Sequence, residues 1–437
     1  MDNFDQIVSI EECKQMIKKY LELENVSVLT GAGTSFHLGA PVIRNIPEEL
    51  EKKYSNEISS YFPIGSSPSF EDFINCLQAD RYLCEQRGAD STTIDTIIGE
   101  MQKWLFENVD TQKTKIHKCY EKDVKLEKNH YHYHEMLVKK LLQRPNNLKR
   151  ANLFTTNYDM AFDYALDNLG VHYINGFSGV HNRCFRPEVY DYDLYYPGES
   201  VTGKVHRAER VLKYYKLHGS LSWISTMPTV SNTYGIKEVP LNDGFIPADG
   251  SELVIYPCVS KKSFTLDLPY SELFRHFAHA INKPQSVLIC LGYSFFDEHI
   301  NDIIHQALSI PSFTLIVANY TPSGGRNSEI DKLIELNDKR IKVLAQNAPD
   351  LSTFAGFVSG VMPELYEEEE KEALALTMKK LYPNVEKKEA SDLVLKKLYS
   401  SAEASLNTAT DRPEEMNIEE IDMIEDNDME EDADEQY

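Results

Sequence analysis

Short runs of apolar residues alternate along this chain with longer stretches of helical periodicity. Some runs, such as Val287–Leu291, are apolar at every position, which is typical of a strand covered by helices on both faces of its sheet. Strands that alternate with helices predict a parallel sheet with crossover helices, so the expected fold class is α/β and doubly wound. The predicted strands are Val26–Thr30, Ala151–Thr156, Tyr214–Leu217, Leu253–Tyr256, Val287–Leu291, Phe313–Ala318 and Ile341–Ala345.

The spacing of these strands indicates two insertions in a Rossmann-like domain at 1–360. About 120 residues separate the first two strands, whereas a bare crossover needs only about 10–12. Because this interval contains helical patterns at Phe70–Leu77 and Ile94–Phe106, we predict a helical insertion over about 45–150. A second insertion, rich in Tyr and Arg, is expected over about 175–213.

The end of the chain differs in character from the rest. A helical C-terminal extension is predicted at 361–412, with charged amphipathic helices at Pro363–Leu381 and Val385–Leu406. The formal net charge is −24, and 413–437 contains thirteen acidic residues but no Lys or Arg. This acidic tail is expected to be disordered, because its charges repel and it has little to bury. Direct nucleic-acid binding is not expected, since phosphates bind clustered Lys and Arg.

Other features of the composition favour a cytoplasmic protein. No apolar run approaches the roughly 18–20 residues of a membrane-spanning helix, and the acidic N-terminus lacks a signal-peptide pattern. The seven cysteines are widely spread and include no Cys-x-x-Cys pair, which argues against a four-cysteine zinc site. His130 and His134 would share a helix face, but further ligands would be needed, so we expect no metal site.

A glycine-rich turn follows the first predicted strand. In Gly31-Ala32-Gly33-Thr34-Ser35, small residues would let backbone N–H groups approach a pyrophosphate, and two hydroxyls add further donors. Phe36 stands where a third glycine would complete the G-x-G-x-x-G pattern. The alternative, a tight turn that merely needs glycine, stays open on this evidence.

Polar residues also follow the next two central strands. Thr155-Thr156-Asn157-Tyr158-Asp159 precedes a predicted helix at Met160–Leu169, so Asp159 either caps that helix or takes part in a site. Asn157 offers both a donor and an acceptor to a ribose hydroxyl or a water. His218 comes after the strand at Tyr214–Leu217, and its imidazole can accept a proton near neutral pH.

Two later strands end in the same manner. Gly292-Tyr293-Ser294 repeats the small, hydroxyl-bearing pattern, and Asp297 is expected to cap the next helix or to bind a ribose. Asn319 follows the strand at Phe313–Ala318. Because ligands of open α/β sheets bind at the carboxyl ends of strands, these residues are expected at one rim.

Taken in order, these segments resemble the motifs of the sirtuin family. Gly31–Arg44 resembles its nucleotide loop, G-A-G-x-S-x-x-x-G-I-P-D-F-R, and Thr155–Asp159 resembles its T-Q-N-x-D motif. Leu217–Ser220 resembles the segment with the family's catalytic histidine, and Gly292–Ser294 resembles the family's G-T-S motif. Asn319 falls where that family has an asparagine after the next strand. The resemblance covers about residues 20–355 without the insertions.

The departures from the pattern narrow what the resemblance implies. Sirtuin deacylases carry two Cys pairs of a zinc module soon after the histidine, whereas here the next cysteine is Cys258. Val42-Ile43 replaces the D-F of the nucleotide loop, so no nicotinamide contact is carried over from those positions. Phe70–Ile74 and the T-T-N-Y-D and G-Y-S-F-x-D forms are similar to the sirtuin-like proteins of bacterial anti-phage defence. Those proteins destroy NAD and form oligomers, some with a HerA-type ATPase.

The resemblance therefore implies an NAD glycohydrolase that uses NAD as its substrate and needs no zinc. It implies His218 as general base and Asn157 as the residue that positions ribose or water. The implied NAD-binding residues are Gly31, Ala32, Gly33, Thr34, Ser35, Arg44, Thr156, Asp159, Gly292, Tyr293, Ser294, Asp297 and Asn319. Two alternatives stay open: a module that senses NAD or ADP-ribose without chemistry, and an NAD-dependent protein deacylase. A homo-oligomer is expected, with a HerA-type ATPase as a candidate partner.

Overall fold

A computed structural model describes the part of the chain that carries most of the predicted strands. The described residues are 10–40, 45–63, 65–66, 68–109, 131–197, 205–241, 253–255, 269–318, 328–344 and 349–365. All of them belong to one unit, 1–368. The predicted helix at Val385–Leu406, nearly all of the one at Pro363–Leu381 and the acidic tail lie outside the described residues.

The centre of the fold is a seven-stranded sheet in the order β14-β13-β12-β1-β2-β8-β3, and every pair in it is parallel. Its strands are β1 (Asn25–Thr30), β2 (Asn152–Thr155), β3 (His172–Ile174), β8 (Val211–Lys216), β12 (Ser286–Leu291), β13 (Thr314–Ala318) and β14 (Ile341–Leu344). Six of the seven predicted strands lie in this sheet, which confirms the α/β, doubly wound class. The strand of this sheet that the sequence did not predict is β3, which has three residues.

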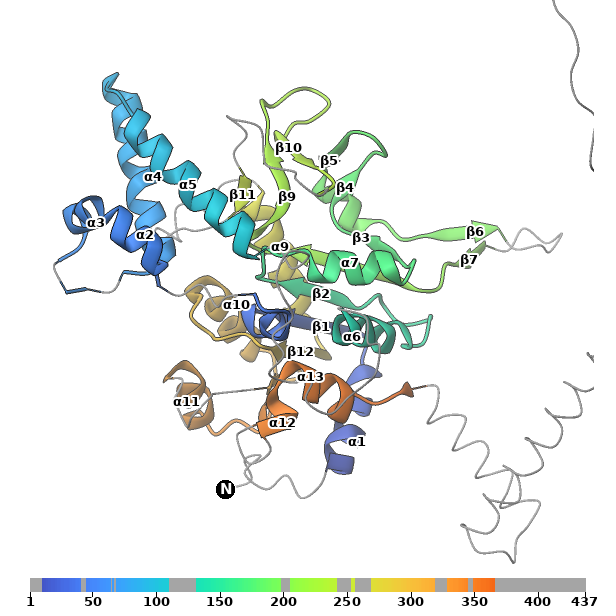
Figure 1. Ribbon diagram of the computed structural model, residues 1–437. Helices are drawn as coiled ribbons and strands as arrows, with labels where there is room; N and C mark the ends of the chain where they lie inside the picture. The colour runs from blue at the N-terminus through green and yellow to red at the C-terminus, as the bar shows by residue number, and fades with distance from the viewer. Residues whose placement is uncertain are drawn as a thin grey trace, which may run out of the picture. The chain divides into compact units, whose positions relative to one another are not determined.

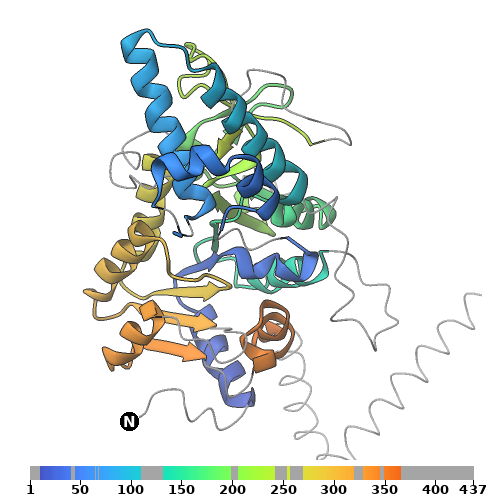
Figure 2. The ribbon, with the colours of Figure 1, turned by 60° about the vertical axis from the view of Figure 1, so that its left-hand side comes forward.

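Helices cover both faces of this sheet, as the continuous apolar strands predict. On one face, Leu29 and Leu288 pack with α9 (Tyr270–Ile281), α10 (Glu298–Leu308) and α11 (Ser328–Glu335). On the other face, Val28 and Ile289 pack with a second group of elements. That group comprises α1 (Ile10–Leu21), α6 (His132–Leu142), α7 (Ala161–Asn168), α12 (Pro349–Ser352), α13 (Phe354–Gly356) and the π-helical turn η7 (Phe357–Val361). Figures 1 and 2 show this layered arrangement.

A second sheet has five strands in the order β11-β9-β10-β5-β4 and is antiparallel. Its members are β4 (Phe177–Ser178), β5 (Arg183–Phe185), β9 (Gly219–Ser225), β10 (Ile236–Glu238) and β11 (Leu253–Ile255). The prediction that Leu253–Tyr256 joins the parallel sheet was therefore wrong. Gly219, the first residue of β9, has a φ of +87°, so the chain turns from β8 into β9 without a crossover helix, and β11 pairs with β9.

Elements between β3 and β8 form the antiparallel sheet's outer strands and a separate ribbon. After β5, the 3₁₀ turn η5 (Pro187–Asp191) leads to the paired strands β6 (Tyr195–Pro197) and β7 (Val205–Arg207). This ribbon projects to the right in Figure 1. Arg207 and Arg150 both contact the Asp193 carboxylate near its base, which anchors the ribbon to the segment before β2.

Among the residues that the structure describes between β1 and α6, four α-helices share a core of their own. These are α2 (Glu48–Lys53), α3 (Ser55–Tyr61), α4 (Phe70–Arg87) and α5 (Thr92–Val109). Both predicted helical patterns lie in α4 and α5. Helix α4 begins with a capping box in which Ser69 and Asp72 exchange hydrogen bonds, the sequence signal of a helix start. The apolar faces of these helices meet Leu221 of β9, so this group packs beside the antiparallel sheet (Figure 1).

Candidate active site

The central strands β12, β1, β2 and β8 are neighbours, and each one ends in a predicted site segment. Because the strands are parallel, Gly292, Gly31, Thr156 and His218 follow them at the same edge of the sheet. In the sheet, β2 lies on one side of β1 and β12 on the other, so the first half of the chain adds strands on one side and the second half on the opposite side. The β1–β12 boundary is thus the topological switch point, where open α/β sheets bind their ligands.

The glycines after β1 and β12 allow two backbone turns to touch. The N–H groups of Gly31 and Gly33 donate to the carbonyls of Leu291 and Gly292 at 3.0 Å. A Cβ on Gly31 would lie 2.7 Å from the Gly292 carbonyl oxygen, and a Cβ on Gly292 would lie 2.6 Å from the Thr34 nitrogen. Glycine is therefore required at these positions because the two turns touch. This requirement is separate from the role of glycine in letting a phosphate approach the backbone.

The same contacts limit which groups of the glycine turn face a ligand. The N–H groups of Gly31, Gly33, Thr34 and Ser35 all donate to carbonyl oxygens. Ala32 is exposed, while the hydroxyl-bearing Thr34 and Ser35 are buried. An anion at this turn would consequently meet the exposed backbone at Ala32 rather than a ring of open N–H groups.

Asn157 is held by two hydroxyls from the glycine turn. Its Nδ2 donates to Thr34 Oγ1 at 3.2 Å and to Ser35 Oγ at 3.1 Å, and its backbone N–H donates to Thr155 Oγ1. The side chain is 8% exposed. With both amide hydrogens directed to the turn, the orientation of the amide is set and Oδ1 is the atom left to accept a further hydrogen bond.

Asp159 accepts a hydrogen bond at the start of a helix and another from the glycine turn. Its Oδ1 accepts the Ala161 N–H at 3.0 Å, so the capping role considered from the sequence is present. Its carboxylate also accepts a hydrogen bond from Ser35. Burial raises the pKa of Asp159 above its ordinary value, and the Ser35 hydrogen bond and Lys216 charge oppose that rise.

Lys216 is a buried residue near the site whose role the sequence analysis missed. Its Nζ donates to the Asp159 carbonyl at 2.6 Å and pairs with Asp163 Oδ2 at 3.0 Å. The Asp163 carboxylate also accepts the Tyr214 hydroxyl. Lys216 thereby fixes the loop that carries Asn157. A lysine at the end of a strand that is otherwise largely buried was the signal available in the sequence.

His218 meets a residue from the far side of the site. Its Nε2 lies 2.9 Å from Asp297 Oδ2, and its ring centroid lies 6.4 Å from that of Tyr158, the neighbour of Asn157. Asp297 also caps α10, because its Oδ1 accepts the N–H groups of His299 and Ile300. One carboxylate therefore starts a helix and holds the imidazole.

The remaining predicted site residues occupy varied positions. Tyr293 is buried, and its hydroxyl contacts Asn301 and the Asp297 carbonyl, so its side chain packs within the fold. Ser294 is exposed, and Thr156 donates its N–H to the Thr30 carbonyl. Arg44 and Asn319 lie outside the described residues.

Within the described ranges, no group of three or more His, Cys, Asp or Glu side chains is arranged to hold a metal ion. His132 and His134 lie in α6, and His134 packs against Phe162 and His37, while His130 is outside the described residues. Among the helices that the structure describes, none has the length and apolar character to cross a membrane.

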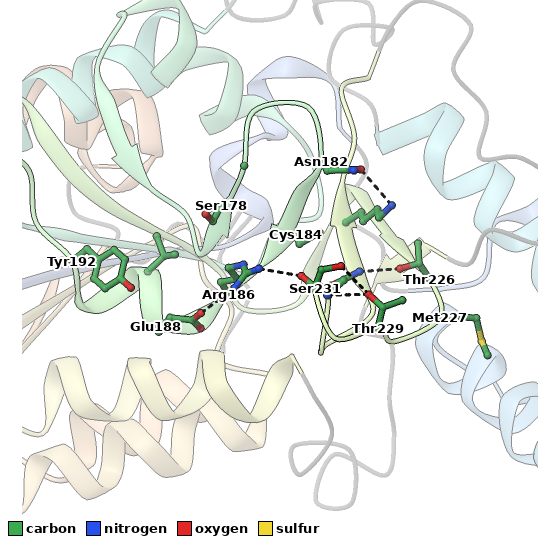
Figure 3. A pocket seen from close by; sticks show the side chains of 14 residues that line it. Ser178, Asn182, Cys184, Arg186, Glu188, Tyr192, Thr226, Met227, Thr229 and Ser231 are labelled. Carbon is green, nitrogen blue, oxygen red and sulfur yellow. Dashed lines mark hydrogen bonds and ion pairs between the residues drawn. The ribbon is translucent and has the colours of Figure 1, made fainter.

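A cavity of about 590 Å³ opens in the antiparallel-sheet region (Figure 3). Arg186 lines it, donating to the Ser231 carbonyl at 3.1 Å and lying 3.8 Å from Glu188. None of the candidate site residues lines this cavity. It is separate from the edge where the four parallel strands end.

The fold and the site together define an α/β protein with a ligand crevice expected at the switch point of a doubly wound sheet. Residues 151–344 match the model of the SIR2-like domain. The matched segment includes Asn157, His218 and Asp297 and begins after the glycine turn. A search of the curated proteins gives no match.

Several solved structures of Sir2 homologues are similar to this chain. A mutant Sir2 homologue in complex with ADP ribose is 16% identical, with 79% of this chain and 96% of that chain covered and a TM-score of 0.36. A Sir2 homolog–NAD complex is 14% identical, with coverages of 79% and 93% and a TM-score of 0.35. A mutant bound to 2′-O-acetyl ADP ribose is 15% identical, with coverages of 80% and 99% and a TM-score of 0.38.

Proposed function

We propose that this protein is an NAD glycohydrolase that cleaves the nicotinamide–ribose bond and releases nicotinamide and ADP-ribose. The observation that carries the proposal is the placement of Asn157 and His218 after the neighbouring strands β2 and β8, at the edge that also holds the glycine turn. The SIR2-like match at 151–344 and the NAD or ADP-ribose named for the similar Sir2 homologues support the choice of substrate.

The proposed reaction needs little covalent chemistry from the protein. The C–N bond breaks with its electron pair leaving on nicotinamide, which becomes neutral, and the ribose carbon develops oxocarbenium character. Water then adds to that carbon and loses one proton, so the products are nicotinamide, ADP-ribose and a proton. The protein's task is to hold the dinucleotide, orient the ribose and accept the proton from water.

His218 is the proposed proton acceptor. Asp297 Oδ2 lies 2.9 Å from Nε2, so the proposal places the hydrogen of the neutral imidazole on Nε2, next to this carboxylate. Nδ1 then carries the lone pair that can take a proton from water or from a ribose hydroxyl. Asp297 would also stabilise the imidazolium formed in that step, because it is an anion within 3 Å of a developing cation.

Asn157 is proposed to position the ribose or the attacking water through Oδ1. Because Thr34 and Ser35 hold its Nδ2, the amide need not reorient when the substrate binds. The other proposed NAD-binding residues are Gly31, Ala32, Gly33, Arg44, Thr156, Asp159, Gly292, Tyr293, Ser294 and Asn319. The proposed mechanism uses no bound zinc ion.

We further propose that the activity depletes NAD in the cytoplasm during anti-phage defence. The support is the likeness of Phe70–Ile74, T-T-N-Y-D and G-Y-S-F-x-D to sirtuin-like defence proteins. On the same basis we propose a homo-oligomer and a HerA-type ATPase as a partner. The domain organisation in this proposal is a 1–360 catalytic domain, a 361–412 extension and a 413–437 acidic tail.

The test is the conversion of NAD by the purified full chain, alone and with the candidate ATPase, followed by chromatography of nicotinamide and ADP-ribose. Asn157→Ala and His218→Ala should each lower turnover by about 10²-fold or more. His305→Ala, at an exposed position on α10, is the matched control and should retain turnover.

Other outcomes would replace the proposal. NAD binding without nicotinamide release in any assembly state would favour a sensing module. Nicotinamide release that depends on an acyl-lysine peptide would indicate a deacylase. Full turnover by both site variants would remove Asn157 and His218 from the mechanism.

A further inference from the structure

A cavity of about 660 Å³ lies at the edge of the parallel sheet opposite the candidate active site. Its lining includes Ala151 just before β2, Val171 just before β3 and Val211 at the start of β8. These positions are at the amino ends of parallel strands, whereas the candidate site follows their carboxyl ends. The cavity's volume falls within the range of roughly 300–1,000 Å³ that is typical of small-molecule sites.

The lining of this cavity is cationic in a protein whose net charge is strongly negative. Five cationic side chains line it against two carboxylates. One of those carboxylates, Glu364, is already paired with Lys140 at 3.3 Å. The cations are Lys139, Arg144, Lys149, Arg150 and Arg210, and the second carboxylate is Glu209.

Arg144 places a buried positive charge in the wall of the cavity. It is 7% exposed, and its guanidinium donates to the carbonyl oxygens of Leu21, Leu23 and Lys149. Carbonyl groups accept these hydrogen bonds, and the Glu24 carboxylate is an anion that also acts on the guanidinium. Burial lowers the pKa of Arg144 to about 10, so the group is still a cation at neutral pH.

Two further cations have their head groups near solvent. The side chain of Lys149 is 56% exposed, and its nearest carboxylate oxygen, on Glu24, is 3.9 Å away. Arg210 is exposed and has a φ of +52°, a left-handed conformation that is costly for a residue other than glycine. Arg150 differs, because Asp193 already neutralises it at 2.9 Å.

Apolar side chains complete the lining. Met136, Leu142, Leu148 and Leu169 lie along the same cavity as the cations. Cationic groups recognise phosphate oxygens, and an apolar wall accommodates the flat, weakly polar surface of a base. We propose that this cavity is a second ligand site, which binds a nucleoside phosphate through Arg144, Lys149 and Arg210.

The proposal is independent of NAD hydrolysis and can be tested with ATP, which contains no nicotinamide–ribose bond. ATP is titrated calorimetrically into the full chain and into Lys149→Gln/Arg210→Gly. The glutamine keeps a donor for Asn25, and the glycine suits the left-handed backbone, so this variant should fold. Lys52→Gln/Lys332→Gln is the control, because it removes two exposed cations elsewhere.

The cavity variant should weaken ATP binding by about tenfold or more, as expected for the loss of two charge-assisted contacts, while the control changes it less than about twofold. Photo-crosslinking with 8-azido-ATP then locates the ligand. Labelled peptides from 132–150 or 205–211 would support the site. Labelling confined to 31–40 or 292–301, equal weakening in both double variants, or no binding at millimolar ATP would overturn it.

Discussion

His218 and Asp297 lie 2.9 Å apart, from Nε2 to Oδ2, although they follow strands β8 and β12, which have β1 and β2 between them. The contact therefore spans the ends of the two strands that carry the glycine turn and Asn157. Since Asp297 also caps α10, its carboxylate fixes the position of the imidazole relative to a helix rather than to a loop. This relationship leads to the first prediction.

Asp297→Asn should keep the helix cap but remove the negative charge beside the imidazole, because asparagine is an equally good N-cap residue. If His218 acts as proposed, NAD turnover should fall by about 10²-fold while the melting temperature stays nearly constant. Asp90→Asn is the matched control, since Asp90 accepts the Thr92 N–H before α5 and is exposed. Equal turnover in the two variants would show that Asp297 has only a structural role.

The contact between the two glycine turns predicts a large effect of one methyl group. Gly292→Ala and Gly88→Ala both add a Cβ at a positive φ, of +59° and +63°, but the space around Gly88 is open for 4 Å. Gly88→Ala should cost about 1 kcal/mol of unfolding free energy. Gly292→Ala should cost about 2–4 kcal/mol, because its Cβ must also displace the backbone of Thr34. Urea unfolding measures both, and equal losses would contradict the close approach.

Lys216→Met should destabilise the protein and also impair the site. Removing the cation leaves Asp163 buried without its ion-pair partner, which costs about 3–5 kcal/mol, and it frees the loop before α7. Lys140→Met is the control, because Lys140 is also buried and donates to the Val358 and Met362 carbonyls. At a temperature where both variants are folded, only Lys216→Met should lower NAD turnover. Equal activity of the two would show that Lys216 does not position Asn157.

The raised pKa of the buried Asp159 carboxyl leads us to expect a specific pH dependence of the folding stability. Its folded-state pKa is raised above the ordinary value of 3.8 by burial, so the folded protein binds a proton at pH values where the unfolded chain has lost it. Ionisation of this group therefore opposes folding as the pH rises above 3.8. Asp159→Asn should gain stability relative to the wild type as the pH is raised from about 4 to 7. Denaturant titrations across this range measure the difference, and a constant or reversed difference would refute the prediction.

Local sequence patterns predicted much of the fold because burial on both faces of a strand demands a continuous apolar run. Val287–Leu291 illustrates this, since it is apolar at every position and lies at the centre of the parallel sheet. Leu253–Tyr256 has the same local character but pairs with the antiparallel strand β9. An apolar run indicates that a strand is buried and does not specify which neighbour it pairs with.

The sequence likewise predicted one part of the candidate site and missed another. The order of the motifs at successive strand ends predicted that Gly31, Asn157, His218 and Gly292 would share one edge, because parallel strands have a common direction. The part played by Lys216 was missed, since a lysine at a strand end is usually exposed, and its burial depends on Asp163 and on carbonyls from another segment.

By itself, the sequence determined six of the seven strands of the parallel sheet, the helical patterns of α4 and α5, and which polar residues terminate the strands, since these follow from short-range periodicity and residue type. Only the tertiary structure decided that Asp297 reaches His218, that the Gly31 and Gly292 turns touch, and that Arg144 and Arg210 line one cavity. The physical reason is that these relationships join residues more than sixty positions apart, and their geometry is set by strand order and packing rather than by local chain preference.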